Sequence, residues 1–284
     1  MIDRLHDQMD ALTTKLAELG AYQLHRQQDV QAQLKSDASF KEAWRANDVV
    51  SEVDLHTEKE LLAFLKQAFG DIPVISEEFN NKAPPAPGEF RFVVDPLDGT
   101  KPYLEGKREF SISIGLMQGR EFVFGGNFYA GLDQFYWAFA DSEGVMDRDG
   151  KPLTPAREWL PECYLSVSFY DLLSPEHRSP EAIHEALGVG VVDYPRSATY
   201  ILKRILEGQT FAYMSKDVYI WDIGPSSLLL DKMGCHVVDL KGVGVDFGSI
   251  AQPPFRHPAA VALPKGREEA FLSRLQRICA SGNG

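Results

Sequence analysis

Apolar residues recur at steps of three and four along the first twenty positions of the chain. These positions are Ile2, Leu5, Met9, Leu12, Leu16 and Leu19. Their spacing predicts an amphipathic helix with one buried face. Gly20 follows the last apolar position, and glycine is common just past the end of a helix. We therefore expect the first helix to end at Gly20. The same period predicts helices over residues 22–35 and 57–69.

Shorter apolar runs between turn-forming residues predict strands in the first half of the chain. They cover residues 71–76, 90–94, 110–116, 121–129 and 134–139, and the last three indicate an antiparallel meander. A proline-rich stretch over residues 80–88 predicts a loop. Turn-forming residues also gather over 141–155, where we expect the boundary between an N-terminal half (1–150) and a C-terminal half (151–284).

Strands and helices alternate in the second half. The predicted strands cover residues 164–169, 189–194, 211–214, 235–238 and 260–263. The predicted helices cover residues 180–187, 198–206, 225–233 and 268–280. This alternation predicts an α/β protein with mixed layers.

The composition is that of a soluble globular protein, because 44% of the 284 residues are hydrophobic and 25% are charged. The net charge of −12 argues against a nucleic-acid polymer or an anionic membrane as partner. An acidic chain can still bind an anionic small molecule where bound cations reverse the local sign. No export signal or membrane-length apolar run is visible, and the three cysteines lie far apart. We expect a cytoplasmic protein with reduced thiols.

The stretch VVDPLDGT, residues 93–100, places Asp95 and Asp98 three residues apart after a predicted strand. Asp, Pro and Gly favour tight turns for conformational reasons, so this stretch by itself fits an ordinary surface turn. Glu77 and Glu78, however, follow another predicted strand, and Asp222 precedes a predicted helix. Acids at three such places indicate a ligand site, because ligands of α/β sheets bind where strands end.

Carboxylate oxygens are the ligands that a hard ion such as Mg²⁺ prefers. Asp95 and Asp98 can bind ions on either side of the turn, and the Leu97 carbonyl can serve as a further oxygen ligand. Gly99 permits close approach of the backbone to a ligand. The amides of Gly99 and Thr100, at the start of a short helix, can bind an anion. No histidine spacing indicates a ligand set.

These three acidic segments resemble the motifs of the lithium-sensitive, magnesium-dependent phosphomonoesterases of the inositol monophosphatase superfamily. That group includes fructose-1,6-bisphosphatase and the 3′(2′),5′-bisphosphate nucleotidases. Residues 47–61 and 144–154 are similar to two further family segments, so the match runs in order from about residue 43 to residue 240. The resemblance implies a layered αβαβα sandwich of the sugar-phosphatase type, with mixed sheets between helix layers, and a homodimer.

The resemblance also implies two or three Mg²⁺ ions, with Mn²⁺ as a possible substitute. A first ion would be held by Glu77, Asp95 and the Leu97 carbonyl. A second would be held by Asp95, Asp98 and Asp222. A third, weaker ion would use Glu77.

Catalytic and substrate contacts are implied in the same way. Thr100, helped by Asp54, would orient and deprotonate the attacking water, with Glu77 beside them. Without the resemblance, Asp54 fits an N-cap of the following helix, so both interpretations stay open. Trp221 fits packing, and Glu78 is either a supporting group or a solvated neighbour. The substrate would be contacted by Gly99, Thr100, Lys101, Ser197 and Asp222.

The chain also departs from the family. Where inositol monophosphatases usually carry Gly-Ser-Ala-Ala, residues 196–199 read Arg-Ser-Ala-Thr. Their substrate-binding glutamate falls on Ser215. The usual Ala-Ala after the Trp-Asp motif becomes Gly224-Pro225, which still fits a helix start because proline suits the first turn. The metal ligands survive these changes, whereas the inositol pocket differs.

We therefore expect Mg²⁺-dependent hydrolysis of a small phosphate monoester, namely inositol monophosphate or a related polyol or sugar phosphate. The alternative is a 3′(2′),5′-bisphosphate nucleotidase, which residues 71–78 and Lys101 favour, although a lone lysine is more often solvated. A protein that binds metal or a phosphometabolite without catalysis is a third hypothesis. Thr100 beside the acids argues against it, because binding needs no hydroxyl that activates water.

Overall fold

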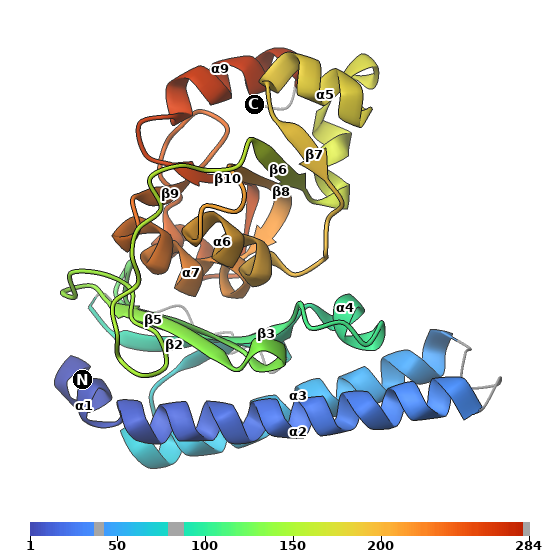
Figure 1. Cartoon of the computed structure of the whole chain (residues 1–284). Helices are drawn as coiled ribbons and strands as arrows, with labels where there is room; N and C mark the ends of the chain where they lie inside the picture. The colour runs from blue at the N-terminus through green and yellow to red at the C-terminus, as the bar shows by residue number, and fades with distance from the viewer. Residues whose placement is uncertain (37–42, 79–87, 281–284) are drawn as a thin grey trace.

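A computed structural model describes residues 1–36, 43–78 and 88–280. The loop expected over residues 80–88 therefore lies almost entirely outside the described residues. Five layers are stacked in the order helix, sheet, helix, sheet, helix (Figure 1). The αβαβα sandwich expected from the resemblance is confirmed. None of the described helices is both long and apolar enough to cross a membrane.

The first sheet contains five strands in chain order. They are β1 (Val74–Ser76), β2 (Phe90–Asp98), β3 (Ser111–Gln118), β4 (Glu121–Tyr129) and β5 (Gln134–Phe139). Strand β1 pairs with β2 in parallel, and all other neighbours are antiparallel, which confirms the predicted meander. The outer face of this sheet is covered by α2 (Met9–Ser36) and α3 (Ala43–Phe69) (Figure 1).

The second sheet has the strand order β7-β6-β8-β10-β9. Its members are β6 (Glu162–Leu165), β7 (Gly190–Val192), β8 (Ala212–Tyr219), β9 (Cys235–Val238) and β10 (Arg256–Pro264). Strand β6 is parallel to both β7 and β8, whereas β10 is antiparallel to its neighbours. The predicted strand over 164–169 is too long, because a 3₁₀ helix, Val167–Leu172, follows β6.

The remaining helices complete the layers. Helices α6 (Ala198–Leu206) and α7 (Ile220–Lys232) lie between the two sheets, and α5 (Pro180–Leu187) and α9 (Glu268–Ile278) cover the far face of the second sheet (Figure 1). Short helices are α1 (Ile2–Asp7), α4 (Thr100–Leu104) and α8 (Phe247–Ile250). The core between the sheets draws residues from both sides of residue 150. The division of the chain there stays a prediction.

Gly20 does not end a helix, so that prediction was wrong. The first helix ends at Asp7, and α2 continues through Gly20 to Ser36. A Cβ atom at position 20 would lie 2.5 Å from the Phe128 ring and 2.9 Å from Cβ of Ala130. The glycine therefore lets α2 approach β4 closely, and packing rather than capping explains it.

Two predicted helix starts were also wrong. Helix α3 begins at Ala43, so Asp54 lies inside it and is not its N-cap. Helix α7 begins at Ile220, which places Pro225 in the helix interior. Proline lacks the N–H that would bond the carbonyl of Trp221, four residues earlier. The Ser113 hydroxyl donates to that carbonyl at 3.4 Å, so the first sheet supplies a partner.

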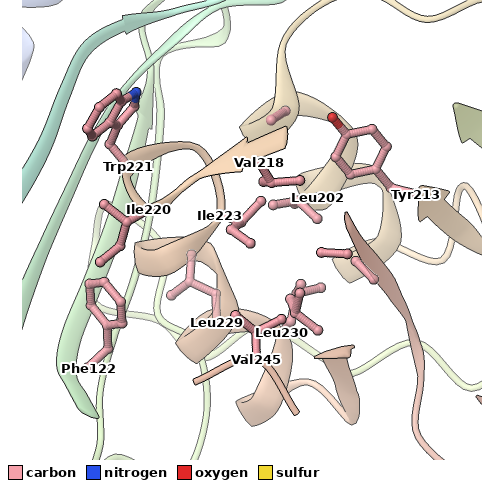
Figure 2. Close-up of a cluster of buried hydrophobic side chains, with 14 of the residues drawn as sticks. Phe122, Leu202, Tyr213, Val218, Ile220, Trp221, Ile223, Leu229, Leu230 and Val245 are labelled. Atoms are coloured by element: carbon pink, nitrogen blue, oxygen red, sulfur yellow. The ribbon is translucent and has the colours of Figure 1, made fainter. Parts of the chain in front are cut away.

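Helix α7 packs unusually close to the first sheet. A Cβ atom at Gly125 would lie 2.2 Å from the carbonyl oxygen of Pro225, and one at Gly224 would lie 2.4 Å from the Phe122 ring. Figure 2 shows Ile220 of α7 beside Phe122, with Leu202 and Tyr213 on the other side of the same cluster. This contact fixes the start of α7 against the sheet that carries the acidic turn.

Candidate active site

Three acids that are distant in sequence meet at the junction of the layers. One carboxylate oxygen each from Asp95, Asp98 and Asp222 can be chosen so that all three lie within 4.8 Å of one another. Asp95 and Asp98 belong to the end of β2, and Asp222 lies in the first turn of α7. Asp95 and Asp98 are 1% and 7% exposed. The structure thus brings together three of the predicted metal ligands.

A β-bulge explains how Asp95 and Asp98 act from one side of the sheet. Residues three apart on a regular strand point to opposite faces. Asp95 lies opposite Ser113 and Asp98 lies opposite Ser111, so β2 uses three steps where β3 uses two. The extra residue turns the second acid back to the side of the first. The Asp-Pro-Leu-Asp spacing is therefore a bulge that aims two carboxylates at one point.

Burial and mutual repulsion make these acids hard to ionise. Burial raises the pKa of Asp95 well above its usual range, and the charges of Glu77, Asp98 and Asp222 raise it further. The pKa of Asp222 is raised by burial and then by Asp98 and Glu77. Carboxylates held this close favour a bound cation, because the cation offsets both their desolvation and their repulsion.

Asp98 is held by the start of α6. Its Oδ2 atom accepts from the Ser197 hydroxyl at 2.5 Å, from the Thr199 amide at 3.0 Å and from the Thr199 hydroxyl. Its Oδ1 atom accepts a hydrogen bond from the Ala198 amide at 3.1 Å, and within the described ranges we find no second donor to it. Burial raises the pKa of Asp98, while these hydrogen bonds oppose the rise. Oδ1 keeps the capacity for a metal bond, and Oδ2 fixes the carboxylate.

Ser197, a predicted substrate contact, is fully buried. Its hydroxyl donates to Asp98 and accepts a hydrogen bond from the Tyr200 amide, which caps α6. Sequence reasoning missed Thr199, which accompanies it. The sequence did contain a signal for Thr199. It lies two positions after Ser197, the N-cap of α6, and from there its hydroxyl reaches the same acceptor, Asp98 Oδ2.

Glu77 and Asp54 belong to the same electrostatic cluster. Glu77 is exposed as a residue, yet its carboxyl group forms a hydrogen bond with Asp95. Desolvation of that group and the charge of Glu78 raise the pKa of Glu77 to about 7, against the lowering effect of the bond. Burial, and after it the charges of Glu77 and Glu78, raise the pKa of Asp54 to about 8. Both predicted residues thus face the acidic centre from outside the three-acid group.

Glu58 on α3 supports the strand that presents Glu77, and sequence reasoning assigned no role to Glu58. The Ser76 hydroxyl donates to Glu58 Oε1 at 2.5 Å, and the Glu78 amide donates to Oε2 at 3.1 Å. Glu58 is fully buried. A buried glutamate with two such donors fixes the end of β1 against α3.

Two buried glutamines of α2 hold the other side of the acidic turn. Gln23 Nε2 donates to the Pro96 carbonyl at 2.8 Å, and Gln27 Nε2 donates to the Tyr103 and Lys107 carbonyls at 2.9 Å and 2.8 Å. These bonds anchor the backbone that carries the Leu97 carbonyl and α4. Sequence reasoning missed both glutamines, because a polar residue on an amphipathic helix normally faces water.

The predicted anion site, formed by the amides of Gly99 and Thr100 and called the phosphate cradle below, lies at the start of α4. Gly99 has φ of +96°, and a Cβ atom there would lie 2.6 Å from the Glu109 carbonyl and 3.0 Å from Cβ of Ser197. Only glycine fits this position. The Thr100 hydroxyl lies 3.4 Å from the Leu97 carbonyl oxygen. The exposed Thr100 and Lys101 thus follow directly after the buried Asp98 and Gly99.

Trp221 packs, as predicted. It is 4% exposed, and its ring stacks on Tyr219 at a centroid distance of 4.8 Å. Ser215, where the resemblance placed the family's substrate-binding glutamate, is 6% exposed. Neither residue adds a charged group to the acidic centre.

This arrangement agrees with a comparison of the whole sequence with known families. The profile of the inositol monophosphatase family matches residues 6–267. The chain belongs to the inositol monophosphatase family.

Individual relatives within the inositol monophosphatase family are distant. The chain is 28% identical over 193 residues to a fructose-1,6-bisphosphatase/inositol-1-monophosphatase of Aquifex aeolicus, which covers 66% of this chain and 70% of the relative. It is 29% identical over 245 residues to the Nus factor SuhB of Xylella fastidiosa, with 84% of each chain covered.

Solved structures share the fold at lower identity. Inositol monophosphatase II of Staphylococcus aureus MSSA476 has a TM-score of 0.70 and 18% identity, over 91% of this chain and 93% of that one. The structure of SaIMPase-II with inositol monophosphate bound has a TM-score of 0.68 and 19% identity, over 93% of both chains. Its 2′AMP complex has a TM-score of 0.70 and 18% identity, over 94% and 97%.

Proposed function

We propose that the chain is a Mg²⁺-dependent phosphomonoesterase that acts on inositol monophosphate or a related polyol or sugar phosphate. The observation that carries the proposal is the meeting of Asp95, Asp98 and Asp222 within 4.8 Å, next to the cradle of Gly99 and Thr100. Family membership supports phosphatase chemistry of the inositol monophosphatase type.

The donor set fits a hard divalent cation. The three grouped ligands are all carboxylates, without thiol or imidazole, and such sets prefer Mg²⁺ or Mn²⁺ to zinc. One ion would be held by Glu77, Asp95 and the Leu97 carbonyl, and a second by Asp95, Asp98 and Asp222. Bound ions of this kind neutralise the phosphate and lower the pKa of a coordinated water.

The chain's own residues perform the remaining tasks. The amides at Gly99 and Thr100 would bind the phosphate oxygens, and Lys101 adds a positive charge beside them. The Thr100 hydroxyl would orient the attacking water. Asp54, which is 7% exposed and lies in the same electrostatic cluster as Glu77, would accept its proton.

The substrate class rests on relatives and on local residues. The Aquifex relative is named for both fructose-1,6-bisphosphate and inositol 1-phosphate, and SaIMPase-II has been solved with inositol monophosphate and with 2′AMP. Ser215 removes a charged partner for a substrate hydroxyl, which relaxes selectivity among polyols.

A bisphosphate nucleotidase is the second candidate, favoured by Lys101 beside the cradle. The aromatic residues that would clamp a base are already paired, Tyr194 with Tyr213 at 5.9 Å and Tyr219 with Trp221 at 4.8 Å. We therefore propose a polyol or sugar phosphate, rather than a bisphosphate nucleotide, as the first candidate substrate. A homodimer, a cytoplasmic location and lithium inhibition are further parts of the proposal.

Phosphate release from inositol 1-phosphate, fructose 1,6-bisphosphate and adenosine 3′,5′-bisphosphate, with Mg²⁺ and with EDTA, tests the proposal. We expect Mg²⁺-dependent turnover that EDTA abolishes and that added Mg²⁺ restores. Adding LiCl, against KCl at the same ionic strength, tests lithium inhibition. Tight binding of a phosphate ester without release of phosphate would instead favour the non-catalytic hypothesis.

A further inference from the structure

Arg196 adopts a backbone conformation that disfavours its own side chain. Its φ is +62°, in the left-handed region where residues with a Cβ atom are strained. A glycine at this position would adopt the same conformation without strain. A strained non-glycine residue next to a candidate site indicates that its side chain serves the site.

The Arg196 side chain has no visible structural task. It is exposed, and among the residues that the structure describes we find no hydrogen bond or ion pair within 4.0 Å that holds its guanidinium. Its electrostatic neighbours are Glu105 and Tyr194. Removing the side chain should therefore leave folding unharmed.

Arg196 lines a cleft of about 410 Å³, a size typical of small-molecule sites. The charged residues in its wall are Lys101, Glu105, Lys107, Asp193 and Arg196, three cations against two acids. Lys107 lies 2.6 Å from Glu105, whereas Lys101 lies 3.8 Å from it. Lys107 therefore already neutralises Glu105. Lys101 and Arg196 outnumber the remaining acid, Asp193, so the wall of the cleft carries a net charge of +1 in an acidic chain.

The two cations flank the proposed phosphate cradle. Lys101 directly follows Thr100, and Arg196 directly precedes Ser197, whose hydroxyl donates to Asp98 at 2.5 Å. A Cβ atom at Gly99 would lie 3.0 Å from Cβ of Ser197, so the two segments are in contact. A substrate with its reacting phosphate at the acidic centre would extend its other end toward this cleft.

We propose that Arg196, together with Lys101, binds a second anionic group of the substrate. A planar guanidinium can bind a carboxylate or a phosphate with two parallel hydrogen bonds, and Lys101 adds a point charge. Arg196 is thus a specificity-determining residue that favours, within the proposed class of polyol and sugar phosphates, the members that carry a second negative group. This inference rests on the proposed phosphatase activity.

Matched substrate pairs test the inference. Glycerol 3-phosphate is compared with 3-phosphoglycerate, in which a carboxylate replaces the terminal hydroxymethyl group. 3′AMP is compared with adenosine 3′,5′-bisphosphate, which adds a phosphate. We expect kcat/KM to favour the doubly anionic member of at least one pair by about tenfold or more. The pair that responds identifies the second group as carboxylate or phosphate.

Three variants assign the preference to Arg196. Arg196→Gly should reduce the preference about tenfold, leave the rate on the neutral member within about twofold, and leave the melting temperature unchanged or higher. Arg196→Lys should keep part of the preference. Arg157→Gly is the control because it removes an exposed arginine of the loop before β6. It should leave the preference for the doubly anionic substrate unchanged.

Two results would overturn the inference. The first is a wild-type enzyme that hydrolyses both members of each pair equally well. The second is an Arg196→Gly variant that loses the same factor on both members, or loses stability, since either would make Arg196 a structural residue. Failure to hydrolyse any monoester with Mg²⁺ would instead refute the proposed function.

Discussion

The hydroxyl of Thr199 donates a hydrogen bond to Oδ2 of Asp98, and the Ser111 hydroxyl lies 2.7 Å from the same Thr199 oxygen. All three side chains are buried, and they join the first sheet to α6 across the layer boundary. Groups that orient a metal ligand commonly change metal affinity tenfold to a hundredfold when they are removed.

Thr199→Val should therefore weaken Mg²⁺ binding by about tenfold or more, because it keeps the shape of the side chain and removes the donor. Titration of activity with Mg²⁺ and calorimetry of Mn²⁺ binding both measure this. Thr210→Val is the control, since Thr210 is equally buried and its hydroxyl bonds the Glu162 carbonyl at 2.8 Å. Equal metal affinity in both variants would show that the Thr199 hydroxyl does not support Asp98 as a metal ligand.

Asp222→Asn should leave the fold intact and lower kcat by about 10³-fold, because a neutral amide holds a second metal ion poorly. Asp231→Asn on the same helix is the control; Asp231 pairs with Lys265 at 2.7 Å on the surface. Activity assays at saturating Mg²⁺ and circular dichroism measure both effects. Near wild-type activity of Asp222→Asn would show that our set of ligands is wrong.

Thr100→Ala should lower kcat far more than it raises KM, because the orientation of water matters mainly in the transition state. Thr14→Ala is the control, since Thr14 is exposed and its hydroxyl likewise bonds a backbone carbonyl, that of Asp10, at 2.8 Å. Steady-state kinetics separate the two parameters. A change confined to KM would assign Thr100 to phosphate binding instead.

The sequence predicted the identity of the acidic residues better than their supports. Asp95, Asp98 and Asp222 could be found because they lie at the end of β2 or at the start of α7, and such positions converge in α/β folds. The bulge that aligns Asp95 with Asp98 could not be read from the sequence, because it depends on the register with β3. Gln23 and Glu58 were missed because burial of a polar helix residue depends on what packs against it.

Two glycine positions were interpreted wrongly from the sequence for a similar reason, because their role depends on tertiary contacts. Gly20 has the spacing of a helix end, yet it serves the contact between α2 and Phe128. Local sequence favours a cap, and the tertiary contact overrides it. Gly224 and Pro225 likewise indicate a helix start, although α7 begins four residues before Gly224 and uses the pair to approach the first sheet.

Gly125→Ala should destabilise the fold by roughly 1–3 kcal/mol, the usual cost of overpacking a core, because the new methyl group would meet the Pro225 carbonyl oxygen at 2.2 Å. Gly144→Ala is the control, because its Cβ atom would meet nothing within 4 Å. Denaturant unfolding measures the difference in the free energy of unfolding. Equal stability of the two variants would contradict the close packing of α7 on β4.

The acidic centre also predicts how stability depends on pH in the metal-free protein. The pKa values of Asp54 and Glu77 are raised to about 8 and about 7 by burial and by neighbouring acids. Those of Asp95, Asp98 and Asp222 are raised as well. The folded state therefore binds more protons than the unfolded state at pH values between about 4 and 8.

The stabilising contribution of these protonated acids is complete below about pH 4 and is lost as the pH rises through the folded pKa values. In EDTA, the melting temperature should thus fall between pH 5 and pH 8. Saturating Mg²⁺ binds the ionised carboxylates, so it should raise the melting temperature more at pH 8 than at pH 5. The double variant Asp54→Asn, Glu77→Gln, melted in EDTA, should show a smaller fall because it lacks two of the raised groups. A melting temperature that does not change with pH in EDTA would show that the folded state does not raise the pKa values of the acids. A fall that Mg²⁺ leaves unaltered would show that the acids do not bind the ion.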